Sequence, residues 1–317
     1  MSFTADVKAE LSNIKDLQCC TRAELAALLH VGGAIELRST GLVLTFQTTN
    51  NAVVRKFLKL FKELFKAEPL TMTKKRLNLQ KNDIFIVEIE DRVQDVIGAL
   101  FLQNKAARFF QEIDERLIAK ECCKRAFLRG AFLAGGSINS PSTATYHMEI
   151  QTFSESLAED LKKLANVFDL NAKTAANKRG FILYVKEAEK IADFLRVSGA
   201  TNELFSFEDS RIKRDFANSI NRVMNCDIAN EEKAIEAANR QLELIAKIEA
   251  LQPTDIPKSL EEIIFLRKRY PESTLHELSF AAEEHFGHMI SKSALNHRFR
   301  ALKDYLNELT FEREERP

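Results

Sequence analysis

The stretch CCKRAFLRGAFLAGG, from Cys122 to Gly136, repeats an earlier stretch of the chain, CCTRAELAALLHVGG, from Cys19 to Gly33. At this offset of 103 residues, seven of fifteen positions are identical, whereas ordinary residue frequencies would give about one. Both stretches are apolar on nearly every side, which is typical of a buried helix. Small residues at Gly130 and Ala134 lie on one helical face and would allow a second backbone to approach closely. The repeat therefore predicts two buried helices that pack together and relate two halves by a pseudo-twofold axis.

The segments that follow the two copies share one order of elements. Period-2 alternation after each Gly-Gly predicts a hairpin, and an amphipathic helix follows, with Asn51 and Ser154 as its expected N-caps. A second strand pair is expected within residues 76–90 and 175–187, and each is followed by a short helix. The sequence thus predicts an α+β fold with two pseudo-symmetric αββαββα halves. Gly32-Gly33 and Gly135-Gly136 are expected to end the repeated helices in the left-handed conformation.

The strand pattern ends near Ser206, and two further parts are expected after it. Residues 206–252 predict a helical linker, one or two long helices, and Pro253 and Pro257 mark its boundary. Residues 253–317 predict three short helices joined by tight turns, as in a helix-turn-helix domain. The start and stop signals are capping boxes at Ser259/Glu262 and Thr274/Glu277, a terminator at Gly287 and an N-cap at Ser291. The first part, residues 1–205, holds the two repeats, at about 19–100 and 122–200.

The third of these helices has the features of a DNA-recognition helix. Its apolar stripe is Leu295, Phe299, Leu302, Leu306 and Leu309, and the opposite side is polar and basic. Between Phe286 and Lys303 there are four basic residues and no acidic one. Short polar side chains, Asn and Arg suit base edges, and cations suit phosphates. The candidate DNA-binding residues are Ser291, Lys292, Ser293, Asn296, His297, Arg298, Arg300 and Lys303.

A second polar face lies at residues 211–225. It carries Arg and Asn without Glu, which fits contact with phosphates, and it equally fits an inter-domain surface. Its residues are Arg211, Arg214, Asn218, Arg222 and Asn225. A third basic stretch, residues 54–81, reads mainly as solvated surface, with non-specific DNA contact as the minor alternative. The expected sheet surface carries Glu36, Gln47, Glu149 and Gln151, which is unfavourable for binding phosphates.

The cysteines suggest chemistry but are interpreted as structural. Zinc ligands usually occur as Cys-x₂₋₄-Cys, because adjacent side chains point apart. His30 would be a further ligand in one copy, but Leu133 takes its place in the other. Buried structural cysteines are therefore expected, with no metal, no cofactor and no small-molecule substrate. Five cysteines without a secretory leader or an apolar run of membrane-spanning length predict a reducing cytoplasm, and the balance of 46 basic and 46 acidic residues excludes nothing about partners.

The stretch LRGAFLAGGSI resembles the LAGLIDADG motif of homing endonucleases, over roughly residues 20–200. The resemblance implies paired axis helices whose terminal carboxylates hold the catalytic metal. Gly32 and Gly135 occupy those positions here, so no metal site and no nuclease activity are expected. An active endonuclease or an RNA-splicing maturase is the alternative that these glycines disfavour.

Together with FANSINRVMNCDIAN and ISKSALNHRFRAL, this stretch makes the chain resemble the bacterial WhiA family over its whole length. The resemblance implies a non-enzymatic regulator of transcription that binds double-stranded DNA, is associated with the nucleoid in the cytoplasm, and serves cell division, chromosome segregation and, where it occurs, sporulation. A division scaffold with incidental DNA binding is the other alternative. In either case the LAGLIDADG-like domain is a candidate surface for a protein partner.

Overall fold

The computed structural model describes residues 2–15, 17–39, 41–74, 83–143 and 145–314 of the 317-residue chain. The chain forms two compact units, Met1–Asp215 and Phe216–Pro317, and each is described by itself. Helix α8 (Thr201–Ala250) contributes its first turns to unit 1 and the rest to unit 2. The expected division at 205 and 252 stays a prediction.

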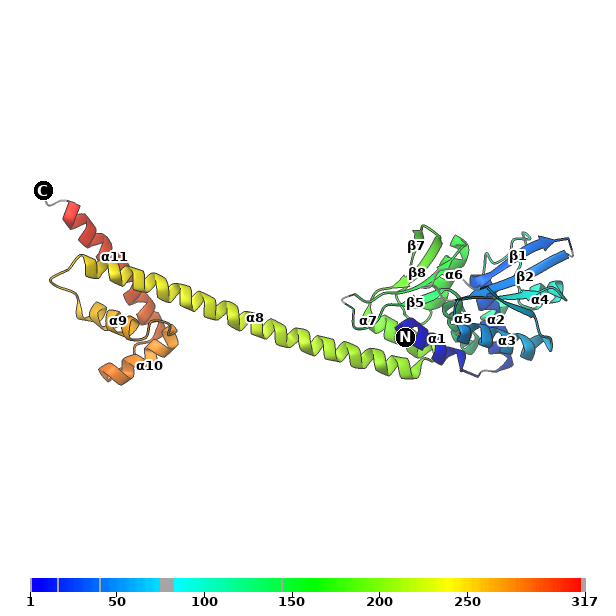
Figure 1. The fold of residues 1–317 in the computed structure, drawn as a ribbon, viewed down its shortest axis with the longest axis horizontal. Helices are drawn as coiled ribbons and strands as arrows, with labels where there is room; N and C mark the ends of the chain where they lie inside the picture. Colours follow the sequence, from blue (N-terminus) through cyan, green and yellow to red (C-terminus); the bar gives the residue numbers. More distant parts are fainter. Residues whose placement is uncertain (1, 16, 40, 75–82, 144, 315–317) are drawn as a thin grey trace. The chain divides into compact units, whose positions relative to one another are not determined.

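Unit 1 contains two halves with the same αββαββα order, as the sequence predicts (Figure 1). The first half comprises α2 (Gln18–Gly32), β1 (Gly33–Arg38), β2 (Gly41–Thr48), α3 (Asn51–Phe65), β3 (Leu70–Lys74), β4 (Ile84–Ile89) and α4 (Val93–Ala99). The second comprises α5 (Glu121–Gly135), β5 (Gly136–Ile138), β6 (Met148–Thr152), α6 (Glu155–Asn166), β7 (Lys173–Asn177), β8 (Gly180–Val185) and α7 (Ala188–Ser198). Helix α1 (Phe3–Ser12) precedes the first half, and a short 3₁₀ helix, Glu115–Leu117, precedes the second.

The two sheets are antiparallel and have equivalent strand orders, β1-β2-β4-β3 and β5-β6-β8-β7. In the first sheet Leu44 and Phe46 of β2 point into the core, and Thr45 between them points to the opposite face. Of the strand pair expected within 76–90, only β4 is confirmed, because residues 76–82 lie outside the described residues. Strand β3, which the sequence analysis did not predict, pairs with β4.

Helices α2 and α5 pack against each other where the two sheets meet (Figure 1). A Cβ atom on Gly130 would collide with the backbone oxygen of Glu24 and would lie 2.9 Å from the Cβ of Ala27. This confirms the prediction that small residues permit close approach of two backbones. Burial extends around nearly the whole of both helices, which is what their apolar sequence indicates.

The prediction of left-handed caps at the double glycines is wrong. Gly33 (φ −89°, ψ 156°) and Gly136 (φ −83°, ψ 149°) are extended, because each helix runs directly into the first strand of its sheet. The adjacent glycines are required by space instead. A Cβ on Gly32 would lie 2.7 Å from the Phe46 ring, and one on Gly135 would lie 2.5 Å from the backbone oxygen of Gln151.

The sequence analysis did not predict the charged groups that are buried around the packed helices α2 and α5. Glu24 is buried between Lys56 (3.3 Å) and Arg129 (3.0 Å), and Arg129 also donates to the backbone oxygen of Ser198. His30 is buried in the core. Among the described residues, neither of its ring nitrogens has a hydrogen-bond partner, and Phe110 and Phe127 pack against the ring.

The N-cap of α3 is Asn50, whose side chain accepts from the backbone N–H groups of Ala52 and Val53, so the prediction of Asn51 is wrong by one residue. Asn50 takes the role because its backbone is extended while Asn51 is already helical. The prediction of Ser154 is confirmed, since its hydroxyl accepts from the N–H of Leu157.

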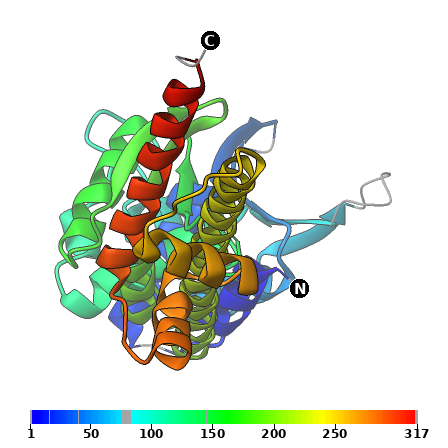
Figure 2. The ribbon, with the colours of Figure 1, turned by 90° about the vertical axis from the view of Figure 1, so that its left-hand side faces the viewer.

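Unit 2 is all-helical and consists of the C-terminal part of α8, α9 (Lys258–Arg269), α10 (Leu275–Phe286) and α11 (Lys292–Glu314). In Figure 2 this part of α8 is yellow, and the later helices run from orange to red. Its core joins Ile245 and Ile248 of α8 to residues of the three short helices. Leu295, Phe299 and Leu302 are buried, while Leu306 and Leu309 are partly buried, so the predicted apolar stripe of α11 is confirmed.

Candidate DNA-binding surface

The turn between α10 and α11 is held by specific contacts. The capping box at Thr274 and Glu277 opens α10, and Gly287 (φ 74°) closes it in the left-handed conformation, as predicted. The buried Ser279 hydroxyl donates to the backbone oxygen of Ile290 at 2.6 Å. Ser291 then caps α11 by accepting from the N–H of Ala294. The start of α11 is therefore fixed relative to α10, as a recognition helix requires.

The capping box predicted at Ser259 and Glu262 is wrong. Pro257 is the N-cap residue of α9 and gives no side-chain cap. The carboxylate of Glu262 instead accepts from Arg298 of α11 at 2.7 Å. This ion pair joins α9 to α11. The capping box does not form because α9 begins at Lys258, so Ser259 already lies inside the helix.

The exposed face of α11 holds most of the predicted DNA-binding residues. The exposed members are Ser291, Lys292, Ser293, Asn296, His297, Arg300 and Lys303. Within the part of the chain that the structure describes, Lys292, Arg300 and Lys303 form no ion pair with a carboxylate. Cations at a helix surface without acidic partners can neutralise phosphates, and Asn and Arg can pair with two atoms of a base edge.

Arg298 differs from the other predicted residues in having an acidic partner. Its side chain is 24% exposed, and it donates to Glu262 and to the backbone oxygen of Ser259. Its position in the sequence lies between the polar face and the apolar stripe, so the residue type alone did not distinguish the two roles. The pair with Glu262 commits the guanidinium to packing inside unit 2.

Arg267 is a structural residue that the sequence analysis missed. It is 2% exposed and donates to Gln241 of α8 at 2.9 Å and to the backbone oxygen of Ser273 at 2.6 Å. Its guanidinium also lies over the Phe299 ring, 5.7 Å from the centroid. Burial lowers the pKa of Arg267. No local signal separates it from its exposed neighbours Lys268 and Arg269, because its partners come from other helices.

The second candidate face divides in two. Arg211 pairs with Glu208 at 3.1 Å, and Arg214 donates to the backbone oxygen of Thr143 and lies 4.1 Å from the Tyr146 ring centroid. These two side chains therefore bind within unit 1. The remaining three, Asn218, Arg222 and Asn225, are exposed on α8.

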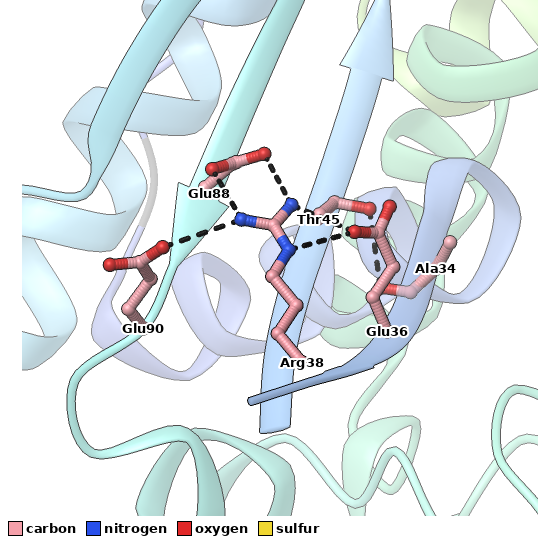
Figure 3. Close-up of polar contacts among 6 residues, drawn as sticks. All are labelled: Ala34, Glu36, Arg38, Thr45, Glu88 and Glu90. Atoms are coloured by element: carbon pink, nitrogen blue, oxygen red, sulfur yellow. Dashed lines mark hydrogen bonds and ion pairs between the residues drawn. The ribbon is translucent and has the colours of Figure 1, made fainter. Parts of the chain in front are cut away.

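The outer face of the first sheet carries a cluster rich in carboxylates (Figure 3). Arg38 contacts three carboxylates, those of Glu36 (2.7 Å), Glu88 (2.7 Å) and Glu90 (3.4 Å). Hydrogen bonds from Arg38 lower the pKa of Glu88, so its carboxylate stays charged. Thr45 lies beside this cluster and donates to the backbone oxygen of Ala34. The cluster has an excess of negative charge and would repel a phosphate backbone.

On the second sheet, Glu149 accepts from Ser137 and contacts His147 at 3.1 Å. This face, too, carries a carboxylate where a phosphate-binding sheet would need cations. The prediction that the sheets are unfavourable for DNA extends to residues that it did not name, Glu88 and Glu90.

The cysteines differ from expectation in two ways. Cys20 and Cys123 are buried, whereas Cys19 is half-buried and Cys122 is exposed. Adjacent side chains were also expected to point apart. Instead, the four sulfur atoms of Cys19, Cys20, Cys122 and Cys123 all lie within 4.8 Å of one another. His30 is not among them, since ten residues of helix separate it from Cys20 by about 15 Å.

Comparison with known proteins covers the same parts of the chain. Residues 18–102 match the WhiA N-terminal LAGLIDADG-like domain, residues 124–217 the WhiA LAGLIDADG-like domain, and residues 220–306 the WhiA C-terminal HTH domain. Proteins named "Probable cell division protein WhiA" from Bacillus cereus and Bacillus anthracis are 42% identical over 310 residues, which is 98% of this chain and 97% of theirs.

Solved structures agree with the fold. Full-length DUF199/WhiA from Thermatoga maritima aligns with a TM-score of 0.58 at 22% identity, over 97% of this chain and 99% of that one. The N-terminal LAGLIDADG domain of DUF199/WhiA aligns with a TM-score of 0.50 at 25% identity, over 62% of this chain and 90% of that one. Among the described helices, none combines the length and apolar character needed to cross a bilayer. With two LAGLIDADG-like halves, a helix-turn-helix unit and relatives that match from end to end, the chain belongs to the WhiA family.

Proposed function

We propose that this protein binds double-stranded DNA through the exposed face of α11. The observation that carries the proposal is the set of exposed cations, Lys292, Arg300 and Lys303, which form no ion pair among the described residues and lie on the second helix of a fixed helix-turn-helix. Asn296 and Arg300 would read base edges, since Asn pairs with adenine and Arg with guanine in the major groove. Lys292, at the start of α11, and Lys303 would contact phosphates, with help from the helix N-terminus.

Other predicted residues take lesser roles in this proposal. Ser291, Ser293 and His297 are exposed beside the reading face and would make shorter polar contacts. Arg298 is left out, because its guanidinium is bound to Glu262. Asn218, Arg222 and Asn225 on α8 stay candidates for phosphate contact.

The acidic outer face of the first sheet supports assigning DNA to unit 2. The carboxylates around Arg38 exceed its single positive charge, so a duplex approaching this face would meet repulsion. This leaves the LAGLIDADG-like halves for another task, and a protein partner is the one we propose. If the protein is instead a scaffold for cell division, its function would not require DNA binding.

We further propose that the protein is not a nuclease. Gly32 and Gly135 stand where the homing endonucleases carry metal-binding carboxylates, and without carboxylate oxygens a hard divalent cation has no ligands. Supercoiled plasmid incubated with the purified protein and Mg²⁺ should remain intact. Cleavage that depends on Mg²⁺ and co-elutes with the protein would favour the endonuclease alternative.

The relatives' name connects the family with cell division, and DNA binding gives that role a mechanism. We propose a regulator of transcription that acts on the nucleoid in the cytoplasm during division and chromosome segregation, and in sporulation where that occurs. The positions that it occupies on the chromosome, mapped in cells, test the proposal. Occupancy near promoters, with altered expression of the adjacent genes on deletion, is expected.

The DNA-binding surface itself is tested by fluorescence anisotropy with duplexes taken from the chromosomal positions that the protein occupies in cells. Asn296→Ala and Arg300→Ala should each weaken binding about 5- to 150-fold, because a bidentate contact is worth about 1–3 kcal/mol. The matched control is Lys247→Ala, which removes an exposed cation from α8 of the same unit. Unchanged affinity of both α11 variants would reject the assignment of this helix.

A further inference from the structure

The four clustered cysteines occupy equivalent places in the two halves of unit 1. Cys19 and Cys20 are the second and third residues of α2, and Cys122 and Cys123 are the second and third residues of α5. Because α2 and α5 pack together about the pseudo-twofold axis, the two pairs face each other at one end of it. The internal repeat therefore brings together residues that lie about a hundred positions apart.

The spacing of the sulfur atoms matches a tetrahedral metal site. The Sγ atoms are 4.0 Å apart within the Cys19–Cys20 pair and 4.0 Å apart within the Cys122–Cys123 pair. All four lie within 4.8 Å of one another. A tetrahedral zinc ion with Zn–S bonds of about 2.3 Å separates its sulfur ligands by about 3.8 Å. Small side-chain rotations that move each sulfur atom by a few tenths of an ångström would close this difference.

Burial raises the pKa of the Cys20 and Cys123 thiols, and the starts of the two helices offset part of the cost of forming thiolates there. Both pairs lie in the first turn of a helix, where unpaired backbone N–H groups and the helix dipole stabilise negative charge. The N-cap residues of the two helices, Leu17 and Lys120, provide no side-chain cap for these N–H groups. Arg22 and Lys120 line a surface hollow beside Cys19 and Cys123, and Arg116, which also lines it, pairs with Asp114.

Four thiolates and one divalent ion carry a net charge of −2, and two nearby cations offset this charge. Sulfur ligands select soft or borderline ions such as Zn²⁺ over Mg²⁺ or Ca²⁺. Four protein ligands leave no open coordination position, which is the pattern of structural rather than catalytic zinc sites.

We propose that Cys19, Cys20, Cys122 and Cys123 form a structural zinc site that ties the two LAGLIDADG-like halves together at one end of their axis. Binding releases the thiol protons to solvent as the four thiolates coordinate the ion. The ion joins α2 to α5, so it stabilises the interface between the halves. The site is separate from the surface on α11 and does not depend on DNA binding.

Cobalt is the probe, because Co²⁺ in a tetrahedral thiolate site gives intense visible bands and sulfur-to-metal charge transfer. The full chain is reduced, stripped with a chelator and shown to have five free thiols, and Co²⁺ is then titrated without oxygen. One equivalent should produce the tetrathiolate spectrum, and one equivalent of Zn²⁺ should abolish it. A Cys19→Ser/Cys122→Ser double variant should lose the spectrum, while Cys226→Ser, which removes the exposed cysteine of α8, should keep it.

Thermal unfolding gives a second measurement. It compares each protein with and without zinc, so it remains informative when a variant is less stable. Zinc at about 100 times its dissociation constant should raise the unfolding midpoint of unit 1 by about 5 °C or more in the wild type and in Cys226→Ser. The double variant should show no such rise. A fully reduced wild type without a cobalt spectrum would overturn the proposal, as would the weak bands of octahedral Co²⁺. A disulfide between the two pairs in protein purified without reductant, with zinc absent by elemental analysis, would also overturn it.

Discussion

Arg129 of α5 donates to the carboxylate of Glu24 of α2 at 3.0 Å inside the axis of unit 1, where both side chains are shielded from water. The pair breaks the internal symmetry. At the repeat offset of 103, the counterpart of Glu24 is Phe127 and that of Arg129 is Ala26. Two copies of α2 packed together would bury two carboxylates without Arg129. The ion pair therefore favours association of the two unlike halves over self-association of either.

Removing Glu24 should be costly, because the buried cations Lys56 and Arg129 would both lose the carboxylate that they contact. Glu24→Gln should lower the free energy of unfolding of unit 1 by about 3–5 kcal/mol, measured by urea denaturation with hydrogen exchange of the axis helices. The matched control is Asp95→Asn, which breaks the exposed pair with Arg92 on α4 and should cost less than about 1 kcal/mol. Equal stability of Glu24→Gln and wild type would show that the buried charges are compensated elsewhere.

His30 predicts a dependence of stability on pH. Burial lowers its pKa to about 4, and Asp114 opposes this shift in part. The unfolded chain has the ordinary value of about 6.5, so it binds more protons than the folded chain between pH 6.5 and pH 4. The contribution of His30 to stability is therefore present above pH 6.5 and is lost as pH falls towards 4.

His30→Leu removes this titration and places in α2 the residue type that Leu133 supplies in α5. As pH falls from 7 to 4, the free energy of unfolding of the variant should rise relative to that of the wild type by up to about 3 kcal/mol. Burial raises the pKa of Glu24 to about 7, which has the opposite effect on stability, but it acts on both proteins and cancels in the difference. His276→Leu changes an exposed histidine on α10 and should leave the pH profile of unit 1 unchanged. Parallel profiles for His30→Leu and wild type would contradict the prediction.

The repeat was enough to predict the architecture of unit 1, because burial and strand alternation leave a strong periodic signal. It gave the two halves, their hairpins and their shared axis. It could not give the conformation of Gly33 and Gly136, since the need for glycine comes from neighbours such as Phe46 and Gln151 rather than from backbone angles. The helix cap predicted at Thr274 is present, whereas the cap predicted at Ser259 is not, because α9 begins before that residue.

For the candidate DNA-binding surface, too, features set by neighbouring residues in the sequence could be predicted, and features set by other helices could not. A polar face on α11 follows from helical periodicity, and most of its predicted residues are exposed. Arg298 and Arg267 could not be separated from surface cations, because their partners lie on other helices. The cysteine cluster was missed for a related reason. Adjacent cysteines give poor metal spacing within one helix, and only the packing of α2 against α5 brings the two pairs together.

Two basic residues of α11, Arg298 and Lys303, should behave differently. Arg298→Ala should lower the free energy of unfolding of unit 2 by about 1–2 kcal/mol, since it leaves the largely buried Glu262 without its partner. Lys303→Ala should leave stability within about 0.5 kcal/mol and should reduce the slope of log affinity against log salt by about 1. Thermal unfolding and anisotropy at several salt concentrations measure both quantities. A reduced salt slope in Arg298→Ala at unchanged stability would return that residue to the DNA-binding set.

Restoring a carboxylate at the end of an axis helix should not restore a nuclease. In Gly135→Asp the new Cβ would lie 2.5 Å from the backbone oxygen of Gln151 and 2.6 Å from Val31, so strand β6 or helix α2 must move. We expect a loss of about 3 kcal/mol or more in the stability of unit 1 and no cleavage of plasmid with Mg²⁺. Gly98→Asp is the matched control, because a Cβ there meets no atom within 4 Å, and its stability should stay within about 1 kcal/mol of the wild type. If Gly135→Asp were as stable as Gly98→Asp, the glycine would not be required by packing, and its presence would need another cause.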